Sequence, residues 1–334
     1  MDEARFSPEG LVRSARYGDT MDNVVLPYLK AHGESVTVKG AGDKPLFAEK
    51  YTSDGARGTV FLVHGFTENG FKFSELIHSL LKNGFDAVTY DQRGHGRSWR
   101  DEKVRADMSL THVKDFDEYV EDLKRVVEHF RPEAKEPFFV FSHSMGGAVT
   151  GLILERYPGV FARAVFCAPM IAPRRLGLPL YAARAICIAA KLAGQGKKRM
   201  LFGKPYSGPE DFETSCATGK ERFDWYDAVK AAREEFHNNG PTYSWTLEAL
   251  DVTKELLAPG APEKITIPVR VYQAENDGSV LPEEQKLFAD RLPNGSIEKV
   301  PGSRHEIYRS TDEALFPWWA EVLGFLKEET KDKD

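Results

Sequence analysis

Residues 138–147 read Phe138-Phe139-Val140-Phe141-Ser142-His143-Ser144-Met145-Gly146-Gly147. The four leading residues are apolar on both faces, which is typical of a strand buried inside a parallel sheet. A helical pattern follows directly over residues 146–157, so Ser144 stands at a sharp turn from strand to helix. Such a turn needs small residues two positions before and after the serine, because the backbones are forced close together. Ser142 and Gly146 meet that need.

This arrangement predicts a nucleophile elbow with Ser144 as the nucleophile. The common pattern is Gly-x-Ser-x-Gly, and Ser142 takes the place of the first glycine. The helix after Ser144 directs its backbone N–H groups and the positive end of its dipole at the serine, which favours a developing negative charge there. The alternative is an ordinary turn with a surface serine, and the flanking strand and helix favour the elbow.

The rest of the chain alternates between strand patterns and helical patterns. A hairpin is predicted near the start, at residues 35–38 and 46–51. Further strands are predicted at residues 59–63, 87–90, 164–167, 267–272 and 296–300. Helices are predicted at residues 23–31, 73–82, 115–130, 146–157 and 314–326. This alternation predicts a mostly parallel sheet that is covered by helices on both faces.

The alternation stops between residues 171 and 250, where helical sequence, first basic and then acidic, takes over. We expect this segment, the cap segment, to be an insertion that divides the core into residues 1–170 and 251–334. The whole chain has a net charge of −6, but residues 171–209 contain no acidic residue. The basic residues in that range are Arg174, Arg175, Arg184, Lys191, Lys197, Lys198, Arg199 and Lys204.

These basic residues have two interpretations. The simpler one is a solvated helix face. In the other, Arg184, Lys191 and Lys198 follow one another every seventh residue beside apolar side chains, and they form the charged stripe of a helix that lies on a surface. We hypothesise on this basis a peripheral contact between the basic cap and anionic lipid or a phosphate-bearing substrate.

A serine nucleophile of this kind needs a general base, and the chain order in such enzymes is serine, acid, histidine. Only His237 and His305 follow Ser144. His237 lies in the cap segment, whereas His305 lies in a loop after the last strand, so His305 is the predicted base. For the acid we choose Asp277, which follows the strand at residues 267–272. Glu275 is the second choice.

Acyl transfer also needs donors for an oxyanion. The strand at residues 59–63 ends in His64-Gly65-Phe66-Thr67, and the backbone N–H groups of Phe66 and Met145 are the candidate pair. We expect His64 to order this loop. His143 is interpreted as structural, because the side chain beside the nucleophile points away from it. The glycine-rich turn at residues 90–98 is interpreted as scaffold.

The totals exclude several classes of protein. The acidic polar start does not resemble a secretory signal, and no apolar stretch reaches the ~18 residues that a spanning helix needs. An odd number of cysteines, Cys167, Cys187 and Cys216, without close spacing predicts neither disulfides nor a zinc site. We therefore expect a cytoplasmic protein. The negative net charge argues against nucleic acid as a partner, and the oligomeric state stays open.

Together these motifs resemble the bacterial lysophospholipase and monoacylglycerol lipase branch of the α/β-hydrolase superfamily, over about residues 35–326. The specific marks beyond the elbow are Thr67-Glu68-Asn69 with Lys72-Phe73, Asp91-Gln92-Arg93-Gly94, residues 112–119, residues 240–245 and His305-Glu306-Ile307. The resemblance implies an α/β-hydrolase fold with a mostly parallel eight-stranded sheet and a helical cap over an acyl pocket.

The resemblance also implies Ser144, Asp277 and His305 as the catalytic triad, in agreement with the reasoning from position. The expected activity is hydrolysis of a small-molecule, lipid-like acyl ester through an acyl-enzyme, without a cofactor or metal. A non-lipid esterase, an aminopeptidase on the same fold and a ligand sensor with low turnover are the alternatives.

Overall fold

The computed structural model describes residues 5–175, 177–201 and 203–328. Its centre is an eight-stranded sheet with the order β1-β2-β4-β3-β6-β7-β9-β10. The strands are β1 (Gly33–Lys39), β2 (Pro45–Tyr51), β3 (Thr59–Val63), β4 (Asp86–Tyr90), β6 (Phe138–His143), β7 (Arg163–Cys167), β9 (Val269–Asn276) and β10 (Gly295–Arg304). Only β2 runs against its neighbours among these strands, so the sheet is mostly parallel. The predicted fold class is therefore confirmed.

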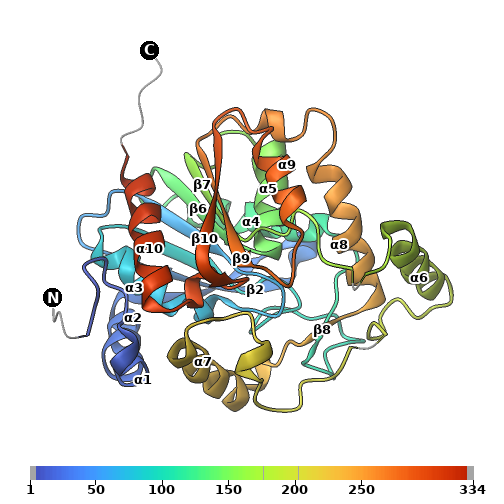
Figure 1. The fold of residues 1–334 in the computed structure, drawn as a ribbon, viewed down its shortest axis with the longest axis horizontal. Coiled ribbons are helices and arrows are strands. Elements are labelled where there is room, and N and C mark those ends of the chain that lie inside the picture. Colours follow the sequence, from blue (N-terminus) through green and yellow to red (C-terminus); the bar gives the residue numbers. More distant parts are fainter. Residues whose placement is uncertain (1–4, 176, 202, 329–334) are drawn as a thin grey trace.

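Two hydrophobic cores lie on opposite faces of the sheet, because successive residues of a strand point to opposite faces. In β3, Val60 and Leu62 belong to one core, whereas Phe61 and Val63 belong to the other. The first core contains residues of α2 (Leu26–His32), α3 (Ser74–Lys82) and α10 (Asp312–Lys327). The second contains residues of α4 (Asp117–Phe130), α5 (Met145–Arg156), α8 (Tyr243–Leu256) and α9 (Pro282–Ala289) (Figure 1).

The predicted strands and helices are present, and their ends shift by a few residues. β10 runs four residues past its predicted end to Arg304 and so delivers His305 directly from a strand. The helix predicted at residues 23–31 begins earlier, as α1 (Tyr17–Thr20) and a π-helical stretch at Met21–Val25 that leads into α2. One small pair of strands was not predicted, β5 (Leu110–Thr111) and β8 (Gly240–Pro241).

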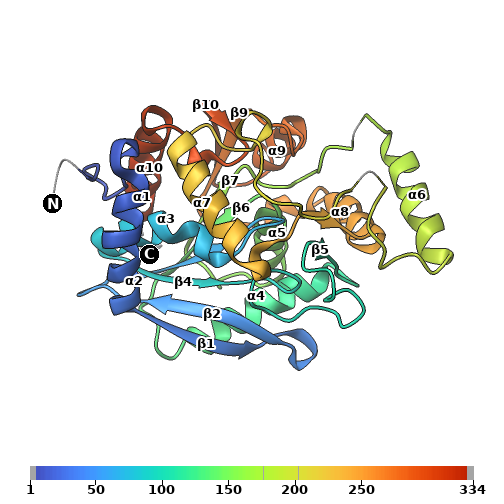
Figure 2. The same ribbon diagram turned by 90° about the horizontal axis from the view of Figure 1, so that it is seen from below.

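Within the cap segment, α6 (Leu180–Leu192) and α7 (Lys220–Ala232) precede α8. The position chosen as its end, residue 250, falls inside α8, which packs against the core. Figures 1 and 2 show α6 at the outer edge of the molecule, beyond α8. The helix ends at Leu192, so Lys198 does not continue a stripe on it as the seven-residue spacing predicted.

The charges of α6 also face differently from the expectation. Arg184 pairs with Asp251 at 2.5 Å and Lys191 with Glu248 at 3.3 Å, and both acidic residues lie on α8. Besides Lys191, Lys197 and Lys198, α6 and its flanks expose several large apolar side chains. They are Leu178, Tyr181, Ile186, Ile188, Leu192 and Leu201. No helix in the described ranges is long and apolar enough to cross a membrane.

Candidate active site

Ser144 occupies the turn between β6 and α5 in a strained backbone conformation, with φ 50° and ψ −118°. Gly146 allows this turn to pass close to β3, since a Cβ on it would overlap the carbonyl oxygen of Val63. The predicted need for small residues around the serine thus has a direct structural cause. Ser144 itself is largely buried.

The three residues predicted to act together lie in one hydrogen-bonded row. The Nε2 of His305 lies 2.8 Å from the Oγ of Ser144, and its Nδ1 lies 2.8 Å from the Oδ2 of Asp277. The parallel strands β6, β9 and β10 end at the same edge of the sheet, which explains why residues 144, 277 and 305 meet there. Glu275, the second choice for the acid, instead accepts a hydrogen bond from the N–H of Gly302 at 2.8 Å.

The loop after β9 fixes Asp277 as an ionised acceptor. Its Oδ1 accepts hydrogen bonds from the N–H groups of Ser279, at 2.8 Å, and Val280, at 3.0 Å. Burial by itself would raise the pKa of Asp277, but the neighbouring His305 and these N–H donors outweigh it, so the pKa lies below its usual value. Asp277 can therefore hold the His305 ring in one orientation with Nδ1–H towards the carboxylate.

The two N–H groups predicted to bind an oxyanion stand beside the serine. Met145 is the first residue of α5, and Phe66 follows Gly65, where an added Cβ would lie 2.9 Å from the Cβ of Ser144. Neither the N–H of Phe66 nor that of Met145 donates a hydrogen bond to any group in residues 5–328, the gaps at 176 and 202 aside. Both donors are thus available to a ligand at Ser144.

The other histidines that the sequence singled out have structural surroundings. His64 is buried, with Nδ1 2.8 Å from the carbonyl of Gly65 and Nε2 2.8 Å from the N–H of Gln92. Burial lowers the pKa of His64, so the neutral ring joins the loop after β3 to the loop after β4. His237 lies in the cap segment, where its ring stacks on that of Tyr206.

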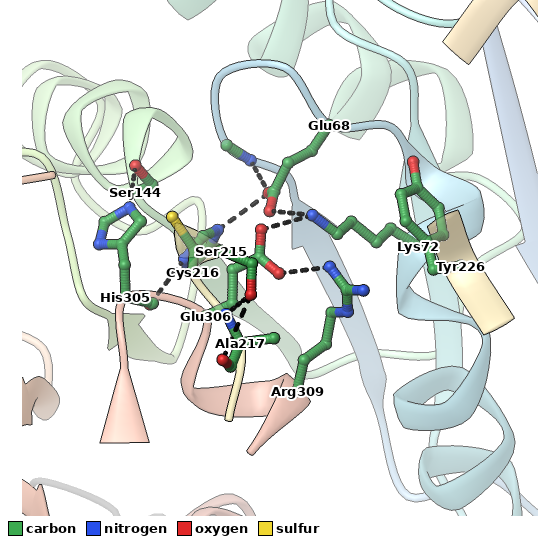
Figure 3. A network of polar contacts seen from close by, with 12 residues as sticks. Glu68, Lys72, Ser144, Ser215, Cys216, Ala217, Tyr226, His305, Glu306 and Arg309 are labelled. Atoms are coloured by element: carbon green, nitrogen blue, oxygen red, sulfur yellow. Dashed lines mark hydrogen bonds and ion pairs between the residues drawn. The ribbon is translucent and has the colours of Figure 1, made fainter. Parts of the chain in front are cut away.

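A charged network that the sequence analysis did not assign to the site lies next to these residues (Figure 3). Glu68 pairs with Lys72, Lys72 with Glu306, and Glu306 with Arg309, at 3.2, 2.6 and 2.5 Å. Glu68, Lys72 and Glu306 stand in the sequence motifs that carry the family resemblance. Their position beside Phe66 and His305 in the sequence was the signal that could have pointed to a role at the site.

A polar cavity of about 200 Å³ adjoins this network. Thr67 and Glu306, the sequence neighbours of Phe66 and His305, are among its lining residues. Three basic and three acidic side chains line it: Lys72, Lys230, Arg309, Glu210, Asp227 and Glu306. The cavity is therefore rich in hydrogen-bonding groups and balanced in charge. No three His, Cys, Asp or Glu side chains of the described chain are placed to share a metal ion.

The family model for serine aminopeptidase, S33, matches residues 54–312, which is most of the chain. The chain belongs to this hydrolase family. It is also 30% identical to lysophospholipase L2 of Escherichia coli strain K12 over 282 residues, 82% of this chain and 81% of that protein. The monoacylglycerol lipase of Mycolicibacterium smegmatis is 24% identical over 285 residues, 83% of this chain and 91% of that one. The resemblance read from the sequence is thereby confirmed.

Solved structures agree on the fold. A soluble variant of the monoglyceride lipase from Saccharomyces cerevisiae, solved with a substrate analogue, superposes with a TM-score of 0.68. It is 20% identical, and the match covers 89% of this chain and 97% of that one. The solved structure shows the α/β-hydrolase fold, and the family match and the relatives above make the chain a serine hydrolase.

Proposed function

We propose that the protein hydrolyses carboxylic esters through an acyl-enzyme on Ser144. The observation that carries this proposal is the row Ser144–His305–Asp277, with two 2.8 Å contacts, next to two backbone N–H groups without an acceptor among the described residues. His305 would take the proton from Ser144 as its oxygen attacks the ester carbonyl, and Asp277 would stabilise the imidazolium that forms.

The later steps follow from the same geometry. The N–H groups of Phe66 and Met145 would stabilise the negative oxygen of the tetrahedral intermediate. His305 would then protonate the departing alcohol, and it would activate a water molecule that releases the fatty acid from Ser144.

For the substrate we propose a lipid-like ester, a monoacylglycerol or a lysophospholipid. The names of the relatives support the lipid class. The polar cavity is lined by Glu306, the sequence neighbour of His305, and it supports an alcohol part with several hydroxyl groups. Its balanced charge favours an uncharged or zwitterionic head over an anionic one. The head group would leave through this side of the site.

A substrate panel tests both parts of the proposal. It compares monoacylglycerols, zwitterionic and anionic lysophospholipids, short p-nitrophenyl esters and an aminoacyl p-nitroanilide. We expect monoacylglycerols and zwitterionic lysophospholipids to give the highest kcat/KM. A fluorophosphonate probe should label the wild type. Ser144→Ala should lower kcat roughly 10⁴- to 10⁶-fold and abolish labelling.

Three outcomes would contradict the proposal. Preference for the anilide would make the protein an aminopeptidase, and preference for short esters would make it a non-lipid esterase. A ligand that binds without repeated product release would indicate a sensor.

We also propose a cytoplasmic enzyme whose cap segment contacts anionic lipid. Its three cysteines are free thiols, which suits a reducing compartment. Besides the two pairs of α6 with α8, Lys197 pairs with Asp101 and Arg199 with Asp107, so much of the basic charge is neutralised within the molecule. The exposed apolar side chains of α6 therefore supply most of the proposed contact, and the basic residues add to it.

Vesicle cosedimentation tests the lipid contact with two variants. Tyr181→Ser with Leu192→Ser removes the two most exposed apolar side chains of α6, at 77% and 85%. The triple change of Lys197, Lys198 and Arg199 to Gln removes charge. We expect the first variant to lose binding and the second to weaken binding to anionic vesicles, as added salt should. Binding that ignores salt and both variants would refute the lipid contact.

A further inference from the structure

His143 lies between two hydrogen-bond acceptors. Its Nδ1 is 2.9 Å from the Oε2 of Glu68, and its Nε2 is 3.1 Å from the backbone carbonyl oxygen of His305. A neutral imidazole has one N–H, so it could serve only one of these acceptors, whereas an imidazolium has two. The ring is buried, with a side-chain exposure of 2%, so no solvent replaces either partner.

The proton between His143 Nδ1 and Glu68 cannot belong to Glu68, because hydrogen-bond donors already surround its carboxylate. Oε2 accepts from the N–H of Gly65 at 2.6 Å as well as from His143. Oε1 accepts from the hydroxyl of Tyr308 at 2.6 Å and from Lys72 at 3.2 Å. Burial alone would raise the pKa of Glu68, but His143 and Lys72 outweigh it and hold the pKa well below its usual value. The residue is a carboxylate.

The pair joins three parts of the candidate active site. Glu68 holds the N–H of Gly65 and thereby the loop that carries Phe66. His143 precedes Ser144 in the chain and contacts the backbone of His305. Lys72 connects the same carboxylate to Glu306, the neighbour of His305 (Figure 3). The buried pair of Glu68 and His143 thus contacts the loop that carries Phe66, the turn at Ser144 and the backbone of His305.

We propose that His143 is a buried imidazolium that acts as a positioning residue, and that loss of its proton at alkaline pH releases the His305 loop and slows acylation of Ser144. The inference rests on the proposed function of Ser144 and goes beyond the triad. When one proton leaves, the remaining proton stays on Nδ1 beside the carboxylate. Nε2 of His143 then presents a lone pair to the backbone carbonyl oxygen of His305. The hydrogen bond between these two atoms is lost and is replaced by electrostatic repulsion.

Other charged and titratable groups face this pair. They are Lys72 beside Glu68, Tyr308 and His305 against the His143 ring, Cys167 on the neighbouring strand β7, and Glu306 with Arg309 behind Lys72. Burial lowers the pKa of His143, but Glu68 outweighs burial and the pKa is raised.

Two of these neighbours, Tyr308 and Lys72, keep their protons as the pH rises above neutrality. Burial raises the pKa of Tyr308 well above its usual value. For Lys72, burial would lower the pKa, but Glu306 and Glu68 outweigh it and the pKa is raised. An alkaline change at the His143 ring is therefore not expected to come from Tyr308 or Lys72.

Nitrogen-15 NMR of the imidazole groups tests the protonation state directly and does not need turnover. We expect both ring nitrogens of His143 to carry a proton at pH 7, with the signal assigned by its absence from His143→Gln. In Glu68→Gln the same ring should be neutral with a single proton at that pH. A single ring proton on His143 in the wild type at pH 7 would overturn the proposal.

The rate of fluorophosphonate labelling of Ser144, measured against pH, tests the positioning role. The labelling rate of the wild type should fall as the pH rises above neutrality. His143→Gln should label about 100-fold more slowly at neutral pH because the geometry relaxes. The variant should not show the alkaline decline, because the titrating group is gone. His129→Gln, an exposed change on α4, should match the wild type throughout.

The controls separate the possible failures. Thermal unfolding confirms that each variant folds. If the wild type is never labelled, the proposed function fails while the NMR result still stands. If His143→Gln keeps the alkaline decline of the wild type, or labels as fast as it does, the positioning role fails while the function of Ser144 stands.

Discussion

The guanidinium of Arg222, on α7, donates two hydrogen bonds of 3.0 Å to the carboxylate of Glu75, on α3. It also pairs with Asp312 of α10 at 2.8 Å and donates to the backbone carbonyl of Val12 at 2.6 Å. Its side chain is fully buried. A single residue of the cap segment is therefore bonded to the N-terminal segment and to two helices of the core.

Replacing Arg222 by Met should lower the free energy of unfolding by about 3–5 kcal/mol, because two carboxylates lose a buried partner. Arg184→Met is the matched control. Its pair with Asp251 is partly exposed, and its loss should cost about 0–1 kcal/mol. Urea denaturation measures both values. Equal losses in the two variants would show that the buried pair contributes no more than a surface one.

The role of Asp277 can be separated from that of Glu275, which lies two residues earlier. Asp277→Asn should reduce kcat about 10⁴-fold, since the amide no longer holds His305 with Nδ1–H towards the carboxylate. Glu275→Gln should stay within a few-fold of the wild type, because the Glu275 carboxylate accepts from the backbone N–H of Gly302. Steady-state ester hydrolysis gives both numbers. The reverse order of effects would assign the acid to Glu275.

The close passage of the elbow beside β3 predicts opposite effects at two glycines. Gly146→Ala should yield protein that is unfolded or has lost labelling of Ser144, since its Cβ would overlap the carbonyl oxygen of Val63. Gly324→Ala, in α10, has open space around its Cβ and should stabilise the fold by about 0.5–1 kcal/mol. Thermal unfolding and probe labelling measure the two outcomes. A folded, fully labelled Gly146→Ala protein would contradict the close packing of the elbow on β3.

The pH dependence of the free energy of unfolding should show the effect of the ion pairs of Glu306 with Lys72 and Arg309. Burial would raise the pKa of Glu306, but Lys72 and Arg309 outweigh it and lower the pKa to about 2. A lowered pKa stabilises the fold above the unfolded-state pKa of ~4.3, and this contribution is lost as the pH falls towards the folded-state pKa. The free energy of unfolding should thus differ between wild type and Glu306→Gln by a constant amount near neutrality. The difference should shrink between pH ~4.3 and ~2. A constant difference down to acid pH would contradict this ion pairing.

The fold was predictable because its central strands β3, β4, β6 and β7 are buried on both faces. A run such as residues 138–141 has no solvated face, and few other structures tolerate four such residues before a turn of small ones. The three residues Ser144, Asp277 and His305 were found by another regularity, since chain order and strand ends narrow the candidates to a few positions.

The charged network was not predictable in the same way. Glu68 and His143 are separated by 75 residues, and Lys72 and Glu306 by 234, so no local pattern links them. The pairing of the basic residues of α6 could not be predicted for a similar reason. Arg184 and Lys191 pair with Asp251 and Glu248 on α8, and that pairing depends on two helices that meet only in the folded chain.

α6 and α7 are held by different kinds of ion pair, and salt weakens the two kinds to different extents. Salt screens the partly exposed pairs between α6 and α8, whereas it scarcely reaches the guanidinium that anchors α7. Concentrated salt should therefore loosen the contact of α6 with α8, while α7 stays bound to the core through Arg222.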